Sequence, residues 1–166
     1  TKDEIKKITD SYKKMGVKHI VALRGDMPKF IDFEPCPGGY KSSIDLVRNL
    51  SQQNFNVTVS AYPEKHPDAL SLDKDIEFLK KKIDAGATMA ITQFCFDYEI
   101  ILTYRDLLQK HNINIPIIPG IMPTTNFKGI KKMAKRCSTS IPKWLENKYN
   151  GLEDKIDERK KVSKEI

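Results

Sequence analysis

The chain has 166 residues, enough for one ordinary domain, and 39% of them are hydrophobic, enough for a core. No apolar stretch reaches the roughly 20 residues of a membrane span, and the N-terminus lacks the charged, apolar and small-residue series of a signal peptide. These features predict a cytoplasmic protein with no membrane partner. The first residue is Thr1 rather than Met, so we expect that the start was removed or never recorded.

The net charge of +7 raises the question of nucleic-acid binding. The basic residues are 24 Lys against 5 Arg, and they scatter over predicted helix faces without interleaved aromatic residues. Recognition of bases and phosphates favours the planar fork of Arg. The sequence therefore indicates solvated helix faces and no nucleic-acid partner, although an anionic small ligand remains compatible with the charge.

Three cysteines, Cys36, Cys95 and Cys137, show neither CxxC nor metal-site spacing and cannot all pair. This usage is typical of free thiols in a reducing compartment, and no metal site is expected.

Four short apolar runs predict β-strands at residues 19–23, 57–61, 89–92 and 115–118. A stretch with helical periodicity lies between each pair of runs, so the pattern predicts a parallel sheet with right-handed crossovers. Ligands of such α/β folds bind at the carboxyl ends of the strands. Four strands form either a small doubly wound sheet or half of an eight-stranded barrel, because a whole barrel needs about 250 residues.

The predicted helices start at recognisable caps. A capping box at Thr1–Glu4 begins a helix that ends at Gly16, and a loop over residues 27–40 precedes a helix over 43–53. The later helices are expected after Ser71 or Asp73, after Asp97, after Thr125 or Asn126, from Pro142, and from Glu153 onward.

Arg24, Gly25 and Asp26 stand at the end of the first predicted strand. The carboxylate and guanidinium could meet one polar ligand, with Gly permitting close approach, or they could form an ion pair that closes a turn. The spacing leaves both interpretations open.

His66 follows Tyr62 in the next strand-end loop, and Asp75 and Lys82 lie seven residues apart on the following predicted helix. They could bind the phosphates and sugar of a nucleotide, but an ordinary solvated helix explains them as well and is favoured by the residues alone. Gln93, at the third strand end, is suited to reading a heterocycle edge. None of the common nucleotide, zinc or hydrolase motifs is present.

Several strings in register along the whole chain resemble the methylenetetrahydrofolate reductase family, in its short bacterial form. They are His19–Asp26, Ala61–Pro67, Asp84–Ala87, Ile91–Phe94, Ile117–Ile121, Asn126–Lys128 and Ile141–Trp144.

The resemblance implies a flavoprotein oxidoreductase with a (βα)₈ TIM barrel, of which residues 1–166 would cover about strands four to seven. It implies hydride transfer from NAD(P)H through FAD to 5,10-methylenetetrahydrofolate, giving 5-methyltetrahydrofolate for methionine synthesis. The full-length enzyme would be a homo-oligomer. In the family, a Glu that acts as general acid and a final strand lie in parts that this chain does not include. We therefore expect a fragment that is inactive alone and of low stability.

The resemblance also implies the site residues. Asp26 would be catalytic, near the flavin and the pterin, and Gln93 would bind the pterin of the substrate. FAD would be bound by Arg24, Gly25, Asp26, Ser43, Tyr62, His66, Ala69, Asp75, Lys81 and Lys82. Three positions depart from the family pattern: Phe78 replaces an Asn at FAD, Gly129 replaces a Gln at the substrate, and Met133 replaces a stacking Phe.

Two other classes remain as alternatives. A non-catalytic, flavodoxin-like nucleotide-binding or scaffold module would keep the strand-end residues without turnover. A Schiff-base aldolase would need an inward lysine on a strand, which none of the four strand ends offers convincingly.

Overall fold

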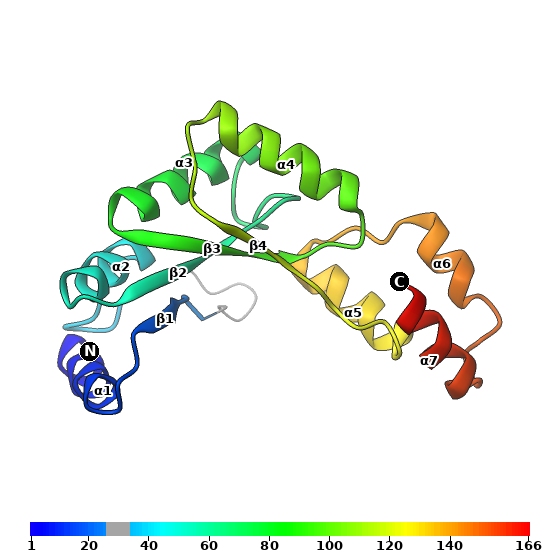
Figure 1. Cartoon of the computed structure of the whole chain (residues 1–166), viewed down its shortest axis with the longest axis horizontal. Coiled ribbons are helices and arrows are strands. Elements are labelled where there is room, and N and C mark those ends of the chain that lie inside the picture. The colour runs from blue at the N-terminus through cyan, green and yellow to red at the C-terminus, as the bar shows by residue number, and fades with distance from the viewer. Residues whose placement is uncertain (26–33) are drawn as a thin grey trace. The chain divides into compact units, whose positions relative to one another are not determined.

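The predicted alternation of helices and strands is confirmed by the computed structural model, which describes residues 1–25 and 34–166 (Figure 1). In chain order the elements are α1 (Lys2–Lys14), β1 (His19–Ala22), α2 (Ser43–Gln52), β2 (Asn56–Ala61), α3 (Leu72–Asp84), β3 (Ala87–Phe94), α4 (Tyr98–Lys110), β4 (Ile117–Gly120), α5 (Phe127–Cys137), α6 (Lys143–Tyr149) and α7 (Ile156–Glu165). Asp26 and residues 27–33, the first half of the expected 27–40 loop, lie outside the described residues.

The described strands form one sheet in the order β1-β2-β3-β4. β1 and β2 run parallel, with His19 opposite Asn56 and Ala22 opposite Val59. Each strand therefore pairs with its successor in the chain, as expected of successive βα units in an α/β fold.

The chain divides into two compact units. The first unit comprises residues 1–60 and 77–91, and the second comprises residues 61–76 and 92–166. The boundaries fall within β2, α3 and β3, so these elements contribute residues to both units.

In the first unit, the apolar face of α2 packs in the core through Val47 and Leu50, which are 0% and 3% exposed. The predicted capping box of α1 is present, because the Thr1 hydroxyl accepts from the Glu4 backbone and the Glu4 carboxylate binds back to Thr1. The apolar stripe of that helix is nevertheless open to solvent: Tyr12 is 38% and Met15 65% exposed. α1 is thus a well-capped helix with an uncovered hydrophobic face.

In the second unit, α5, α6 and α7 form a small helical cluster. Phe127 and Tyr149 stack with ring centroids 4.4 Å apart, and the Tyr149 hydroxyl lies 2.7 Å from the Thr124 hydroxyl. Leu145 is fully buried beside them, whereas the neighbouring Trp144 is 45% exposed. Burial of these apolar side chains and the hydrogen bond between the Thr124 and Tyr149 hydroxyls stabilise this cluster.

The structure settles the caps that the sequence left open. Asn126, rather than Thr125, caps α5 by accepting from the Gly129 backbone, and the Ser71 hydroxyl accepts from the Lys74 backbone at the start of α3. Some expected boundaries were wrong. α7 begins at Ile156 rather than near Glu153, because turns that bond Leu152 to Tyr149 and Lys155 to Leu152 occupy the interval. β3 extends two residues beyond the expected 89–92 at each end, and β4 lies two residues after the expected 115–118.

Gly120 allows β4 to approach β3 closely in the second unit. Its backbone N–H donates to the Thr92 hydroxyl over 2.9 Å. A Cβ added at Gly120 would collide with the Thr92 carbonyl oxygen and would lie 3.0 Å from the Phe94 nitrogen. Both are backbone atoms of a strand, so a side chain could be accommodated only by moving β4.

We expect Gly120→Ala to destabilise the chain by about 2 kcal/mol, the usual scale of overpacking. Urea denaturation followed by circular dichroism would measure the change. Gly25→Ala is the matched control, since a Cβ at Gly25 would meet none of the described residues within 4 Å. Equal midpoints for the two variants would show that the β3–β4 contact does not restrict side-chain size.

Candidate functional site

A shallow hollow lies in the second unit where β2 and β3 end. Its walls are Tyr62, Pro63, Glu64 and Lys65 after β2, Gln93 and Phe94 at the end of β3, and Cys137, Ser138 and Thr139 after α5. It contains about 180 Å³ of empty space, part of it open to solvent. It leaves no enclosed space for even a water molecule, so it is a surface depression rather than a preformed ligand pocket.

Hydrogen bonds fix the wall that follows α5. The Ser140 backbone N–H donates to both carboxylate oxygens of Glu64, at 3.2 and 3.0 Å, and the Thr139 hydroxyl donates to the Phe94 carbonyl over 3.3 Å. Ser138 adopts the left-handed conformation at the end of α5, with φ of 54°. The strand-end segments of β2 and β3 are therefore tied to one turn.

Tyr62, His66 and Asp75 come together in the second unit. The Asp75 carboxylate accepts from the His66 backbone N–H over 2.7 Å, and the rings of Tyr62 and His66 meet edge to face with centroids 4.6 Å apart. The His66 Nδ1 atom accepts from the Asp68 backbone N–H over 3.1 Å. Asp75 thus holds the backbone of the loop that carries the Tyr62 and His66 rings. It is not simply a solvent-exposed residue on a helix surface, as the favoured sequence interpretation expected.

The same carboxylate influences a buried tyrosine. Burial raises the pKa of the Tyr104 hydroxyl well above its usual range, and the negative charge of Asp75 raises it further. Tyr104 is 4% exposed on α4. It therefore stays a neutral phenol next to the Asp75 loop.

Lys82 is a buried cation of the first unit, with only 5% of its surface exposed. Its ammonium donates to the Ser60 carbonyl over 3.1 Å and to the Ser60 hydroxyl over 3.3 Å. The ring of Phe78 lies 5.0 Å from the same ammonium. The expectation of a solvated helix is therefore wrong for Lys82. Phe78, which replaces the Asn of the family pattern, makes a cation–π contact with the Lys82 ammonium.

The remaining expected site residues are less enclosed. In the first unit, Arg24 and Gly25 follow β1 and are exposed, Lys81 is exposed on α3, and Ser43 is the first residue of α2 behind the cap Ser42. In the second unit, the Ala69 carbonyl accepts from Lys65 Nζ over 2.6 Å, which closes the loop that also contains His66. Gln93 lies in the hollow, and its side-chain oxygen accepts from the Phe94 backbone over 3.1 Å.

Glu64, which lines the hollow, was not singled out by sequence reasoning, and its charge acts on the Cys95 thiol. Burial raises the pKa of the Cys95 thiol to about 11, and the nearby negative charges of Glu64 and Asp97 act in the same direction. The thiol donates to the Asp97 carbonyl over 3.3 Å. Only the position of Glu64 in the polar run after a strand could have indicated its role.

Comparison with known proteins decides the family. A sequence model of methylenetetrahydrofolate reductase matches residues 1–166. The chain belongs to the methylenetetrahydrofolate reductase family. It is 44% identical over 170 aligned residues to 5,10-methylenetetrahydrofolate reductase of Escherichia coli strain K12, and 36% identical over 168 residues to methylenetetrahydrofolate reductase (NADH) 1 of Arabidopsis thaliana.

The alignments cover much of this chain but less of its relatives. The whole chain matches 55% of the Escherichia coli protein, and 92% of the chain matches 28% of the Arabidopsis protein. The chain therefore spans about half the length of the bacterial reductases it matches.

A solved structure shares the fold. It is a Clostridium thermocellum protein described as binding two copies of 5-methyl-5,6,7,8-tetrahydrofolic acid, with a TM-score of 0.53 and 23% identity. The match covers 74% of this chain and 44% of that one. Among the helices of residues 1–25 and 34–166, none combines the length and hydrophobicity needed to cross a membrane.

We expect Cys95 to react slowly with iodoacetamide at pH 8, because a thiol with a pKa of about 11 is about one-thousandth ionised there. Its alkylation rate should rise about tenfold for each pH unit up to pH 10. Peptide mass spectrometry would measure the rate, with the exposed Cys36 as the internal comparison. If Cys95 reacted as fast as Cys36 at pH 8, the raised pKa of the Cys95 thiol would be contradicted.

Proposed function

We propose that this chain is part of a FAD-dependent methylenetetrahydrofolate reductase, which reduces 5,10-methylenetetrahydrofolate to 5-methyltetrahydrofolate with NAD(P)H. The observation that carries the proposal is the family match over residues 1–166. The position of the hollow at the ends of β2 and β3 supports it, because ligands of α/β barrels bind at the carboxyl ends of the strands.

We further propose that residues 1–166 form a partial (βα)₈ barrel and correspond to strands four to seven. The sheet order β1-β2-β3-β4 fits this assignment, since consecutive strands are neighbours throughout a barrel. A doubly wound, flavodoxin-like sheet reverses its strand order at a switch point. The order along the described strands contains no such reversal, which favours the barrel over the non-catalytic module.

The residues at the strand ends fit the chemistry of FAD, which presents two phosphates, hydroxyl groups and a flat heterocycle. By the family resemblance, Arg24 and the buried Lys82 of the first unit would bring positive charge to the phosphates. Tyr62 and His66 of the second unit would bring rings and polar atoms. When bound, FAD supplies the hydride chemistry between NAD(P)H and the folate. Gly25, Ser43, Ala69, Asp75 and Lys81 would complete the cofactor contacts from this chain.

Asp26 and Gln93 are proposed to act on the reacting rings. The Asp26 carboxylate would stabilise positive charge that develops on the folate. Gln93 offers its amide NH₂ group to the pterin edge, because its oxygen already accepts from the Phe94 backbone.

The substrate contacts from α5 are reduced in this chain. A Cβ at Gly129 would lie 2.8 Å from the Asn126 side chain that caps the helix, so a larger residue there requires the cap to shift. Met133 is 40% exposed and offers packing without ring stacking. We propose that the chain alone is inactive, and that the full-length cytoplasmic enzyme is a homo-oligomer.

We expect the purified chain to shift the visible absorption spectrum of added FAD. Lys82→Met should weaken that binding by about 10- to 100-fold, because it removes a buried charge-assisted donor. Asp75→Asn should weaken it less, since Asp75 acts through the backbone of the His66 loop.

Lys80→Met is the matched control, because Lys80 is exposed on the same helix. Circular dichroism would establish that each variant is folded. A folded chain with no flavin shift, or an equal loss in Lys80→Met and Lys82→Met, would overturn the cofactor assignment.

A further inference from the structure

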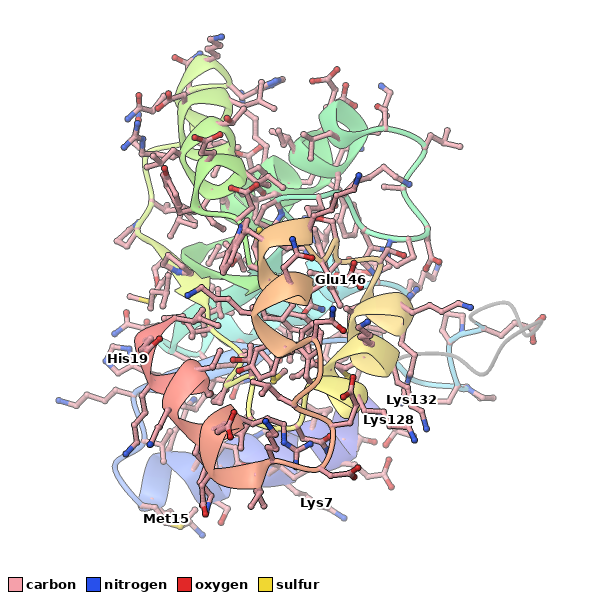
Figure 2. All side chains as sticks on the ribbon, turned by 90° about the vertical axis from the view of Figure 1, so that its right-hand side faces the viewer. Lys7, Met15, His19, Lys128, Lys132 and Glu146 are labelled. Atoms are coloured by element: carbon pink, nitrogen blue, oxygen red, sulfur yellow. The ribbon has the colours of Figure 1, made fainter. Side chains whose placement is uncertain are left out.

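Lys65 folds back onto its own loop instead of extending into solvent. Its ammonium donates to the Ala69 carbonyl over 2.6 Å, and the residue is half-buried. Lys128 and Lys132, in contrast, are exposed and extend outward from α5 (Figure 2). Lys65 forms no ion pair with an acidic residue of ranges 1–25 and 34–166. Its ammonium therefore serves a backbone carbonyl rather than a carboxylate.

The loop that carries Lys65 consists of two consecutive turns of the second unit. The first turn covers residues 62–65 and is closed by the Lys65 backbone N–H, which donates to the Tyr62 carbonyl over 3.2 Å. The second turn covers residues 66–69 and is closed by the Ala69 N–H, which donates to the His66 carbonyl over 3.0 Å. Lys65 thus stands at the junction, and its side chain spans the second turn.

The second turn is held at both of its ends. At its start, the Asp75 carboxylate accepts from the His66 backbone N–H over 2.7 Å. At its end, the Lys65 ammonium binds the Ala69 carbonyl. The next residue, Leu70, is 93% exposed, so burial of its side chain does not hold this end. Loss of the Lys65 ammonium would therefore loosen the end of the turn while leaving its start in place.

Lys65 makes this contact from a strained backbone. Its φ is 78°, in the left-handed region that glycine adopts freely and other residues adopt at a cost. Strain of this kind persists where surrounding contacts fix it, and it is concentrated at ligand sites. A glycine would relax the backbone at position 65 but would lack the bond to Ala69. The backbone strain and the bond to Ala69 can therefore be separated by substitution.

Tyr62, His66 and Ala69, three of the proposed FAD contacts, all lie in these two turns. The rings of Tyr62 and His66 meet edge to face, so their arrangement depends on how the second turn is held against the first. We propose that Lys65 is a positioning residue of the cofactor site, whose bond to the Ala69 carbonyl holds the second turn in the arrangement that receives FAD. This inference rests on the proposed function, because it takes FAD as the ligand of the loop.

Titration of the chain with FAD, followed by visible absorption, tests this role with three variants. Lys65→Met should weaken FAD binding about three- to tenfold, the scale of one hydrogen bond. Lys65→Arg can still donate to the Ala69 carbonyl and should keep most of the affinity. Lys65→Gly should weaken binding as Lys65→Met does, yet keep or raise the midpoint of urea unfolding, because it relieves the left-handed strain. A purely structural role would lower affinity and midpoint together, and that result would overturn the proposal.

Lys132→Met serves as the comparison variant, since it removes the same charge from an exposed position of the same unit. It should bind FAD as the unaltered chain does. The salt dependence of FAD binding should be the same in the unaltered chain and in Lys65→Met. A weaker salt dependence in Lys65→Met would show that the ammonium contacts the phosphates directly, and it would overturn the positioning role.

Hydrogen–deuterium exchange of the chain without FAD tests the latch itself. Residues 62–75 should exchange about three- to tenfold faster in Lys65→Met and Lys65→Gly, because the second turn opens more readily. Unchanged exchange, or unchanged FAD affinity in Lys65→Met, would overturn the role of Lys65 and leave the cofactor assignment standing. An unaltered chain that binds no FAD would instead overturn the cofactor assignment, and the cofactor role of Lys65 with it.

Discussion

Parallel pairing between consecutive strands is the constraint on which the rest of this structure depends. Each strand must begin at the same end of the sheet as its predecessor, so every connection returns through a helix and every polar strand-end residue falls on one edge. In this chain, short strands alternate with capped helices that provide these return connections. It also explains why residues as far apart in sequence as Tyr62, Gln93 and Thr139 line a single hollow.

Within each unit, a few polar contacts and not packing alone hold the elements that carry the expected site residues. Lys82 anchors the α3 helix to the Ser60 backbone, and Asp75 and Glu64 use carboxylates to bind backbone N–H groups of loops. The Lys82 contact satisfies a buried ammonium, whose burial without a partner would be costly. A substitution at one of these side chains is therefore expected to change the stability of the helix or loop that it holds.

The alternation of elements and most helix caps could be predicted from the sequence, because period, capping residues and glycines are local signals. Burial and long-range contacts could not. Nothing near Lys82 in the sequence marks it as enclosed, and the bond between Glu64 and Ser140 joins residues 76 positions apart. The start of α7 was missed because the charged residues after Gly151 suit a turn as well as a helix. Tertiary contacts decide such cases.

The exposure of Trp144 gives the molecule an optical property. It is the single tryptophan of the sequence, and it lies on α6 next to the buried Leu145 of the helical cluster. Its ultraviolet-excited emission therefore reports on the surroundings of that cluster alone, while circular dichroism averages over every helix of the chain. Where the two signals change at different denaturant concentrations, the difference measures how far the first unit can lose its structure while the second unit keeps its own.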